Sequence, residues 1–270
     1  MSGVPVDPLL DVGVQPGTVV HGDNLVAAAR VPSGAATLVY LDPPFNTGST
    51  RRHAPTRGES LRYADRFEDY AGFLLPRLVE ARRLLDDTGT LYLHLDYREA
   101  HYAKVALDGL FGREGFLNEI VWAYDYGGRS TRRWPAKHDT ILVYVKDPER
   151  YHFDAGAVDR EPYMAPGLVT PEKAARGKLP TDVWWHTIVP TNSRERTGYP
   201  TQKPEGIIRR IVTASSAPGD LVVDLFAGSG TTGAVAAALD RRFLLVDDGP
   251  DAIAVMRRRL PGADLFTTAG

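Results

Sequence analysis

Short apolar runs alternate along this chain with segments in which apolar residues recur at helical spacing. Runs of this kind predict strands, and strands that are separated by helices predict a parallel sheet. Two neighbouring runs, residues 117–124 and 140–145, predict a pair of adjacent strands. The pattern therefore predicts an α/β fold with a seven-stranded, mainly parallel sheet, whose strands are residues 19–21, 37–41, 90–95, 117–124, 140–145, 221–226 and 243–246.

Composition indicates a globular protein built around one core. At 270 residues, with 43% hydrophobic and 24% charged residues, the chain is long enough for one well-buried domain and a modest insertion. No stretch approaches the roughly 18 apolar residues of a membrane span, and the N-terminus lacks the basic-then-apolar pattern of a signal peptide. We therefore expect a cytoplasmic protein with no membrane partner.

The first predicted chemistry follows the run at residues 37–41, where the sequence continues Asp42-Pro43-Pro44-Phe45. An amino group on an adenine or cytosine ring is a poor nucleophile, so an enzyme that alkylates it needs acceptors for its N–H bonds. The Asp42 carboxylate and a backbone carbonyl suit this task, because the two prolines stiffen the loop and carry no N–H. Phe45 offers a ring on which an extruded base would stack. An ordinary proline-rich turn is the alternative.

A glycine-rich turn, residues 227–233, separates the predicted strand 221–226 from a helix. It matches G-x-G-x-x-G, so a dinucleotide site is one interpretation. Asp247 closes the next strand, 23 residues beyond Asp224, where nicotinamide and S-adenosylmethionine (SAM) sites both need an acceptor for ribose hydroxyls. The position of the turn within the chain distinguishes a nicotinamide site from a SAM site. A dinucleotide fold usually begins with this turn, whereas only 37 residues follow Gly233 here.

Together these motifs resemble the SAM-dependent DNA methyltransferases that methylate amino groups. The similarity is to the beta group, whose permuted order places D-P-P-[YFW] before the F-x-G-x-G loop. It implies a Rossmann-like SAM-dependent methyltransferase fold, SAM as cofactor and double-stranded DNA as partner. Single motifs are weak signals, but the complete set in this order is highly specific; it comprises residues 21–24, 42–45, 138–140, 199–204 and 224–233.

The resemblance implies roles for individual residues. Asp42, Pro43, Pro44 and Phe45 would form the catalytic pocket for a flipped base. In the cofactor site, Asp224 would meet the methionine amino group and Asp23 the adenine ring; a helix N-cap is the alternative for both. Pro204, expected at the first position of a helix, likewise has a structural reason of its own. The expected cofactor-binding residues are Asp23, Lys203, Pro204, Asp224, Phe226, Gly228, Ser229, Gly230, Thr231, Thr232 and Asp247.

The absence of cysteine excludes one reaction class. Methylation of cytosine at carbon 5 proceeds through attack by a thiolate, which this chain cannot supply. Direct transfer to an exocyclic amine needs no nucleophile from the enzyme, so the missing thiol agrees with the interpretation of Asp42. The seven histidines show no metal-ligand spacing, and we expect no metal site.

Basic residues are clustered, although the net charge of −2 is not typical of a DNA-binding protein. A solvated surface is the alternative for any single cluster. By the resemblance, residues 126–196 form a target-recognition insertion, and residues 1–125 and 197–270 form the permuted catalytic domain. The residues expected to contact DNA are Arg51, Arg52, Arg129, Arg132, Arg133 and Lys137.

We therefore expect a site-specific enzyme that transfers a methyl group from SAM to the N6 amine of adenine in DNA. In the resembled group, Asp at the first motif position usually accompanies adenine; N4-methylation of cytosine is the alternative. An RNA or small-molecule methyltransferase, and a non-catalytic or nicotinamide-dependent Rossmann protein, are less favoured. A homodimer, a cognate restriction endonuclease and a nucleoid-associated location are compatible with the resemblance.

Overall fold

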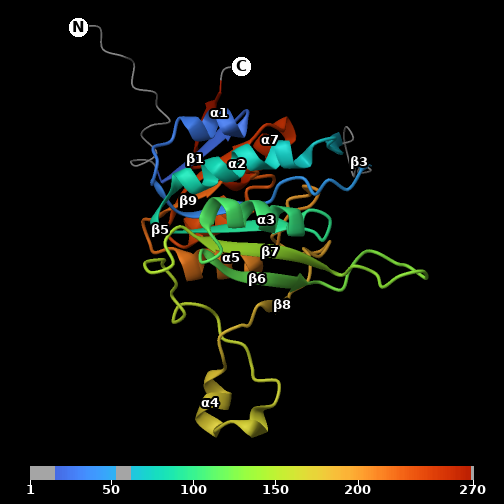
Figure 1. The fold of residues 1–270 in the computed structure, drawn as a ribbon, viewed down its shortest axis with the longest axis vertical. Coiled ribbons are helices and arrows are strands. Elements are labelled where there is room, and N and C mark those ends of the chain that lie inside the picture. The colour runs from blue at the N-terminus through green and yellow to red at the C-terminus, as the bar shows by residue number, and fades with distance from the viewer. Residues whose placement is uncertain (1–15, 53–61, 269–270) are drawn as a thin grey trace.

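A nine-stranded sheet forms the centre of the protein (Figure 1). The computed structural model describes residues 16–52 and 62–268. The strand order is β11-β1-β10-β9-β2-β5-β7-β6-β8, and within this sheet only the pairs that involve β7 are antiparallel. Its strands are β1 (Gly17–His21), β2 (Ala36–Leu41), β5 (Leu85–Leu95), β6 (Phe116–Ala123), β7 (His138–Val145), β8 (Val183–Trp185), β9 (Leu221–Asp224), β10 (Arg242–Asp247) and β11 (Asp264–Thr267); β3 (Ser49–Arg52) and β4 (Arg62–Asp65) pair separately.

Helices cover both faces of the sheet, and each face has its own apolar core. One face carries α1 (Asn24–Ala29), α2 (Tyr70–Leu84) and α3 (Ala100–Phe111). The other carries α5 (Glu205–Ser215), α6 (Thr231–Ala238) and α7 (Pro250–Arg259). Among the described helices, none is long and apolar enough to cross a bilayer.

The two cores follow from the alternation of side chains along each strand. In β2, Val39 and Leu41 belong to the core under α1 to α3, whereas Leu38 and Tyr40 belong to the core on the other face. All six residues of β2 are buried, as expected for a parallel strand that is covered on both sides. This double burial explains why such strands appear in the sequence as continuous apolar runs.

The predicted α/β class and mainly parallel sheet are confirmed, but the predicted count of seven strands is wrong. The seven predicted strands correspond to β1, β2, β5, β6, β7, β9 and β10, and the sheet adds β8 and β11 at its two edges. In β8 only Trp184 is buried, and in β11 no residue is fully buried. Edge strands this short lack the buried apolar run on which the other predictions rested.

Two segments extend beyond the three layers (Figure 1). Residues 124–137 connect β6 to β7 and project from the sheet as the β6–β7 loop. Residues 146–182, the α4 segment, connect β7 to β8 and carry the short helix α4 (Pro171–Arg176) away from the body. Because β7 and β8 pair within the main sheet, residues 126–196 supply two sheet strands as well as the two projections.

The carboxyl ends of four neighbouring parallel strands meet at one edge of the sheet. These strands are β1, β10, β9 and β2. Asp42 directly follows β2, while Asp224 and Asp247 end β9 and β10. In open α/β sheets, ligands bind in the crevice outside these ends. The fold therefore brings together motifs that are far apart in the sequence.

Candidate active site

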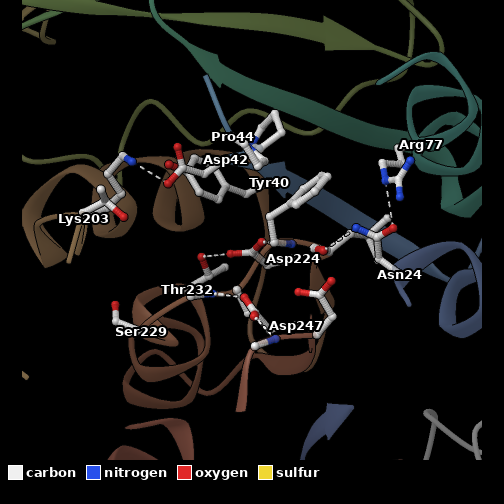
Figure 2. Close-up of a pocket in the computed structure, with 18 of the residues that line it drawn as sticks. Asn24, Tyr40, Asp42, Pro44, Arg77, Lys203, Asp224, Ser229, Thr232 and Asp247 are labelled. Atoms are coloured by element: carbon white, nitrogen blue, oxygen red, sulfur yellow. Dashed lines mark hydrogen bonds and ion pairs between the residues drawn. The ribbon is translucent and has the colours of Figure 1, made fainter. Parts of the chain in front are cut away.

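One cavity of about 450 Å³ is lined by residues of the predicted catalytic motif, residues 42–45, and of the glycine-rich turn, residues 227–233 (Figure 2). It opens at the carboxyl ends of the central strands, between the loop after β2 and the glycine-rich turn after β9. Two members of the predicted cofactor set, Pro204 and Gly230, do not line it. The predicted residues that line it are Asp23, Asp42, Pro43, Pro44, Phe45, Lys203, Asp224, Phe226, Gly228, Ser229, Thr231, Thr232 and Asp247.

The two oxygens of the Asp42 carboxylate have different environments. Oδ2 accepts a hydrogen bond from Lys203 Nζ, and both side chains are largely buried. Oδ1 is buried, has no hydrogen-bond partner among the described residues, and lies 3.6 Å from His94 Nδ1. Buried polar atoms in folded proteins are nearly always hydrogen-bonded. Oδ1 is therefore an acceptor that a ligand with an N–H could use.

The rest of the Asp42 loop is held by its neighbours. Tyr70 Oη donates to the Pro44 carbonyl at 2.7 Å, so that carbonyl is already used once. The Pro43 carbonyl accepts no hydrogen bond from the described residues. The Phe45 ring packs against the His94 ring with centroids 5.6 Å apart, and Lys203 Nζ lies 5.1 Å from its centroid. A fixed aromatic ring thus stands beside the carboxylate group whose Oδ1 has no hydrogen-bond partner among the described residues.

Asp224 is a buried carboxyl on the cofactor side of the cavity. Burial raises its pKa to about 7, against the hydrogen bonds from Thr232 Oγ1 at 2.6 Å and Phe226 N at 2.9 Å. The negative charges of Asp42 and Asp247 raise the pKa further. The N-cap of α6 is Gly230, so Asp224 is not the helix cap. A cation bound beside this carboxyl would favour its charged form.

Each glycine of the turn after β9 occupies a position where a side chain would crowd a neighbour. Gly228 has φ 50°, and a Cβ there would lie 3.2 Å from the Tyr199 ring. At Gly230, with φ 72°, a Cβ would lie 2.7 Å from Met256 Cγ. At the third glycine, residue 233, a Cβ would meet Leu245 Cδ1 at 2.5 Å, where α6 crosses β10. Larger residues would therefore reshape the turn or lift the helix from the sheet.

Asp247 organises the turn as well as facing the cavity. Its Oδ2 accepts from Gly228 N at 2.8 Å and its Oδ1 from Gly249 N at 2.9 Å. Burial raises its pKa, and these two hydrogen bonds act in the opposite direction. Asp248 lines the same cavity. Each carboxylate oxygen can accept more than one hydrogen bond, so Asp247 can hold the turn and still meet a hydroxyl group.

Asp23 caps α1, as the structural alternative predicted. Its Oδ1 accepts from Leu25 N at 2.9 Å and Val26 N at 3.0 Å, and its side chain is 54% exposed. The next residue, Asn24, donates to Leu225 O at 3.0 Å and accepts from Arg77 Nε at 2.9 Å. The cap does not exclude a ligand, since Asp23 also lines the cavity.

Lys203 connects the two sides of the cavity. Its ammonium group binds Asp42, while its backbone carbonyl accepts from Thr231 Oγ1 at 3.1 Å. Thr231 Oγ1 lies 3.0 Å from Ser229 Oγ. Pro204 is the N-cap of α5 and has φ −64°, so its position beside Lys203 is explained by the start of this helix.

The basic residues expected to contact DNA do not line the cavity. Lys137 stands at the base of the β6–β7 loop, where Nζ donates to Gly127 O at 3.2 Å. Trp134, on the same loop, is 95% exposed. The exposed basic residues of this loop are Arg129, Arg132 and Arg133. The other two predicted residues belong to β3, and their side chains are outside the described part of the chain: Arg51 and Arg52.

Sequence reasoning missed a row of hydrogen-bonded polar side chains beside Asp42. His94 Nδ1 lies 2.9 Å from Tyr40 Oη, and His94 Nε2 lies 3.2 Å from Asp139 Oδ2. Tyr124 Oη donates to the other oxygen of Asp139 at 3.1 Å. One signal was present: a histidine inside the apolar run of β5 needs buried partners.

The fold and the cavity together define a class of protein. Terminal carboxylates and a glycine-rich turn at the ends of parallel strands form a site for a nucleoside-containing cofactor. Asp42, whose Oδ1 has no hydrogen-bond partner among the described residues, lines the same cavity and suits an amine substrate. Within the described ranges, no group of three or more His, Asp or Glu side chains could hold a metal ion. The carboxylates at the strand ends, the glycine-rich turn and Asp42 together define an α/β amino-methyltransferase.

Comparison with known proteins gives the family. The sequence model of the N6/N4 DNA methylases matches residues 36–257, so the chain belongs to this family of SAM-dependent DNA methyltransferases. It is 31% identical over 258 residues to the DNA adenine methyltransferase YhdJ of Escherichia coli K12, covering 93% of this chain and 84% of the relative. It is 30% identical over 244 residues to the Type II methyltransferase M.HpaI of Haemophilus parainfluenzae, covering 90% and 73%.

Solved structures agree on the fold. The M1.HpyAVI–SAM complex aligns with a TM-score of 0.62 at 20% identity, covering 90% of this chain and 98% of that one. The cytosine-N4-specific PvuII DNA methyltransferase aligns with a TM-score of 0.63 at 17% identity, covering 93% and 95%. Similarity at this level of identity concerns the fold and does not choose the target base.

Proposed function

We propose that this chain transfers the methyl group of SAM to the N6 amine of adenine at a specific sequence in double-stranded DNA. One observation carries the proposal: Asp42 Oδ1 is a buried acceptor without a described partner, in the cavity that also contains the glycine-rich turn. A base inside a duplex cannot reach such a cavity. The target nucleotide must therefore flip out of the helix.

The Asp42 loop supplies the groups that activate the amine. Asp42 Oδ1 and the Pro43 carbonyl accept its two N–H bonds, which draws the nitrogen lone pair out of conjugation with the ring. Phe45 stacks on the base and limits its orientation. SAM, when bound, would supply the methyl group to this nitrogen, and the electrons of the broken carbon–sulfur bond would stay with its sulfur. Asp42 accepts the proton that the methylated nitrogen loses and passes it to solvent.

Lys203 has a supporting part in this mechanism. Its ammonium group donates to Asp42 Oδ2 and leaves only Oδ1 for the substrate. An ionised carboxylate is the better acceptor, because charge-assisted hydrogen bonds are stronger than neutral ones.

The cofactor side of the cavity fits SAM, which when bound supplies a methyl group on a positively charged sulfur. Asp224 suits the cationic amino group, because that cation would stabilise the charged form of a carboxyl whose pKa burial raises to about 7. Asp247 and Asp248 offer acceptors for ribose hydroxyls, and Gly228 permits close approach of the backbone. A thermal-shift comparison of SAM with NAD tests the assignment: stabilisation by NAD alone would contradict it.

Adenine is the favoured base, and cytosine N4 is the alternative. Asp42 at the first motif position favours adenine, and the relative YhdJ is named an adenine methyltransferase, but a structure of similar TM-score is cytosine-N4-specific. The deciding experiment methylates unmethylated bacteriophage DNA in vitro, digests it and separates the nucleosides. We expect N6-methyldeoxyadenosine. N4-methyldeoxycytidine without the adenine product would refute the choice of base and leave the enzyme class intact.

We assign target recognition to the two projections within residues 126–196, the β6–β7 loop and the α4 segment. The loop carries three exposed arginines, which suit phosphate contacts, and the exposed Trp134 and Tyr126, which suit stacking on bases. Trp185 is also 75% exposed, and it pairs with Ala123 directly before the loop. Basic and aromatic side chains are therefore interleaved on one projecting surface.

We further propose that the enzyme forms a homodimer through the helical face opposite α5 to α7. Exposed apolar side chains gather on α2 and α3, which pack against each other. Burying them against a second copy would remove apolar surface from water. Light scattering of the wild type and of Val105→Glu tests this: a monomeric wild type would refute it. The exposed side chains are Leu75, Val79, Tyr102 and Val105.

A cognate restriction endonuclease and a nucleoid location complete the proposal. The relative M.HpaI is named a Type II methyltransferase, which supports a partner endonuclease that cuts the unmodified site. An enzyme that modifies chromosomal DNA would act in the cytoplasm, at the nucleoid. Challenging DNA from an expressing host with restriction enzymes of known specificity would identify the protected sequence.

A further inference from the structure

His94 is a fully buried histidine between two carboxylates. Its Nδ1 lies 2.9 Å from Tyr40 Oη and 3.6 Å from Asp42 Oδ1, and its Nε2 lies 3.2 Å from Asp139 Oδ2. The rings of Phe45 and Trp122 pack against the imidazole, with centroid distances of 5.6 Å and 5.5 Å. The histidine therefore contacts both the catalytic carboxylate and the ring proposed to stack on the base.

Asp139 determines which nitrogen of His94 carries a proton. Burial acts to raise the pKa of Asp139, but the hydrogen bond from His94, the charge of His94 when it is protonated, the charge of Lys203 and the hydrogen bond from Tyr124 hold it below its ordinary value. Asp139 is thus an ionised carboxylate that can only accept hydrogen bonds. His94 Nε2 must then be the donor, which leaves Nδ1 of the neutral ring as an acceptor.

Tyr40 completes the arrangement on the other side of the ring. Burial raises the pKa of Tyr40, and the charges of Asp42, Asp224 and Asp139 raise it further, so the hydroxyl keeps its proton. That hydroxyl donates to His94 Nδ1. With Tyr40 turned toward His94, and with no proton on Nδ1, neither group donates to Asp42 Oδ1.

We propose that His94 is a positioning residue that, while its imidazole is neutral, leaves Asp42 Oδ1 without a donor from the enzyme and so as an acceptor for the target amine. A protonated imidazole would carry an N–H on Nδ1, facing Asp42 Oδ1 across the 3.6 Å gap. The oxygen would then be occupied by a donor of the enzyme and lost to the substrate. This inference rests on the proposed role of Asp42.

Groups from several elements decide the balance between the two forms. The titratable and charged groups that surround His94, directly or through one neighbour, are Tyr40 in β2, Asp42 after it, Asp96 after β5, Tyr124 after β6, Asp139 in β7, Lys203 before α5 and Asp224 in β9.

The test is the pH dependence of single-turnover methyl transfer, with unmethylated bacteriophage DNA and radiolabelled SAM at saturation. We expect the wild-type rate to fall toward acid pH, because an N–H on His94 Nδ1 would occupy Asp42 Oδ1. Asp139→Asn should move the midpoint to lower pH, because the imidazolium loses its counter-charge. Tyr40→Phe should move it to higher pH, because the neutral Nδ1 loses its donor. Each shift should be about one pH unit.

Further variants separate this role from packing. His94→Asn should lower the rate and abolish its fall toward acid pH, because an amide does not gain a proton in this range. The matched control is His101→Asn, an exposed histidine on α3, which should leave the profile unchanged. Thermal unfolding and SAM binding establish that each variant is folded. If His94→Asn does not fold, the opposite shifts of Asp139→Asn and Tyr40→Phe carry the test alone.

Two outcomes would point to different errors. The inference would be overturned if the pH midpoint of the fall in rate were unchanged in both Asp139→Asn and Tyr40→Phe. A structural defect would lower the rate but would not move this midpoint in opposite directions in the two variants. Near-normal turnover of Asp42→Ala would instead overturn the proposed role of Asp42.

Discussion

Polar residues are buried in the cavity but exposed to solvent on the β6–β7 loop. In the cavity, polar side chains are buried and held by partners: Asp224 accepts from Thr232 and Phe226, and Asp42 accepts from Lys203. On the loop, the arginines and Trp134 are exposed to solvent. The two regions nevertheless belong to one proposed reaction, in which the first performs the chemistry and the second holds the DNA.

The difference predicts how each region responds to change. A buried polar group without its partner costs the full desolvation penalty, so substitutions in the cavity should have large and specific effects. Exposed charges interact through water and salt, so substitutions on the loop should have graded effects that depend on ionic strength. Measurements on both regions can therefore test the division of labour between them.

Asp42→Ala should have the largest effect. Removing the acceptor for the target amine should lower the single-turnover rate by about 10²- to 10³-fold, the cost typical of one preorganised hydrogen-bonding group at a reacting centre. SAM affinity should change little, because the cofactor-side carboxyls remain. Rapid-quench kinetics and calorimetry measure the two quantities. Asp42→Asn is the matched control, since its amide oxygen can still accept, and it should retain an intermediate rate.

Asp224→Asn should weaken SAM binding by about 10- to 100-fold, since a hydrogen bond to a charged group contributes roughly 1.5 to 3 kcal/mol. Calorimetry at pH 8 measures this loss directly. For the wild type, affinity should rise as pH increases through about 7, where the carboxyl becomes charged. An affinity unchanged by the substitution would remove Asp224 from the cofactor site.

The same variant should be more stable than the wild type when SAM is absent. The folded-state pKa of Asp224, about 7, is above the ordinary value of 3.8, so the folded protein holds a proton that the unfolded chain releases between these values. The stability contributed by this carboxyl therefore falls as pH rises through that window. Asparagine avoids the loss, so the variant should melt higher above pH 7, and the difference should shrink toward pH 4. Parallel melting curves would contradict this.

The sequence could predict residues that line the cavity because these residues occupy equivalent positions in the fold. Asp42, Asp224 and Asp247 each end or follow a buried strand, and the ends of parallel strands meet at one edge of the sheet. The three carboxyls converge because β10, β9 and β2 are neighbours in the sheet. The same logic failed for β8 and β11, because short edge strands carry no buried run.

The His94–Asp139 pair was beyond this logic. Asp139 precedes Thr140 and Ile141, which pair with Leu95 and His94 across the antiparallel β5–β7 ladder. A shift of one residue in register would turn these side chains to opposite faces. A single sequence does not specify that register, and it does not show which carboxylate faces a buried histidine.

On the loop side, the combined change of Arg129, Arg132 and Arg133 to Ala should have an intermediate effect. If all three contact phosphates, the slope of log affinity against log salt should become shallower by about two to three, at 0.9 per phosphate. DNA binding measured by fluorescence anisotropy at several salt concentrations gives the slope. The control is Arg257→Ala with Arg258→Ala, exposed on α7 near the other edge of the sheet. Equal slopes for wild type and triple variant would mean that this cluster is only a solvated surface.

Trp134→Ala should have the smallest effect, and one of a different kind. An exposed indole on the arginine-bearing loop can stack on a base, which is worth roughly 1 to 3 kcal/mol, so affinity for DNA should fall by about tenfold. The salt slope should stay unchanged, because no charge is removed. Trp134→Phe should recover most of the affinity, because it keeps an aromatic ring on the loop. If Trp134→Ala flattens the salt slope as the arginine variant does, the loop acts only through its overall fold, and the separation of stacking from phosphate contacts fails.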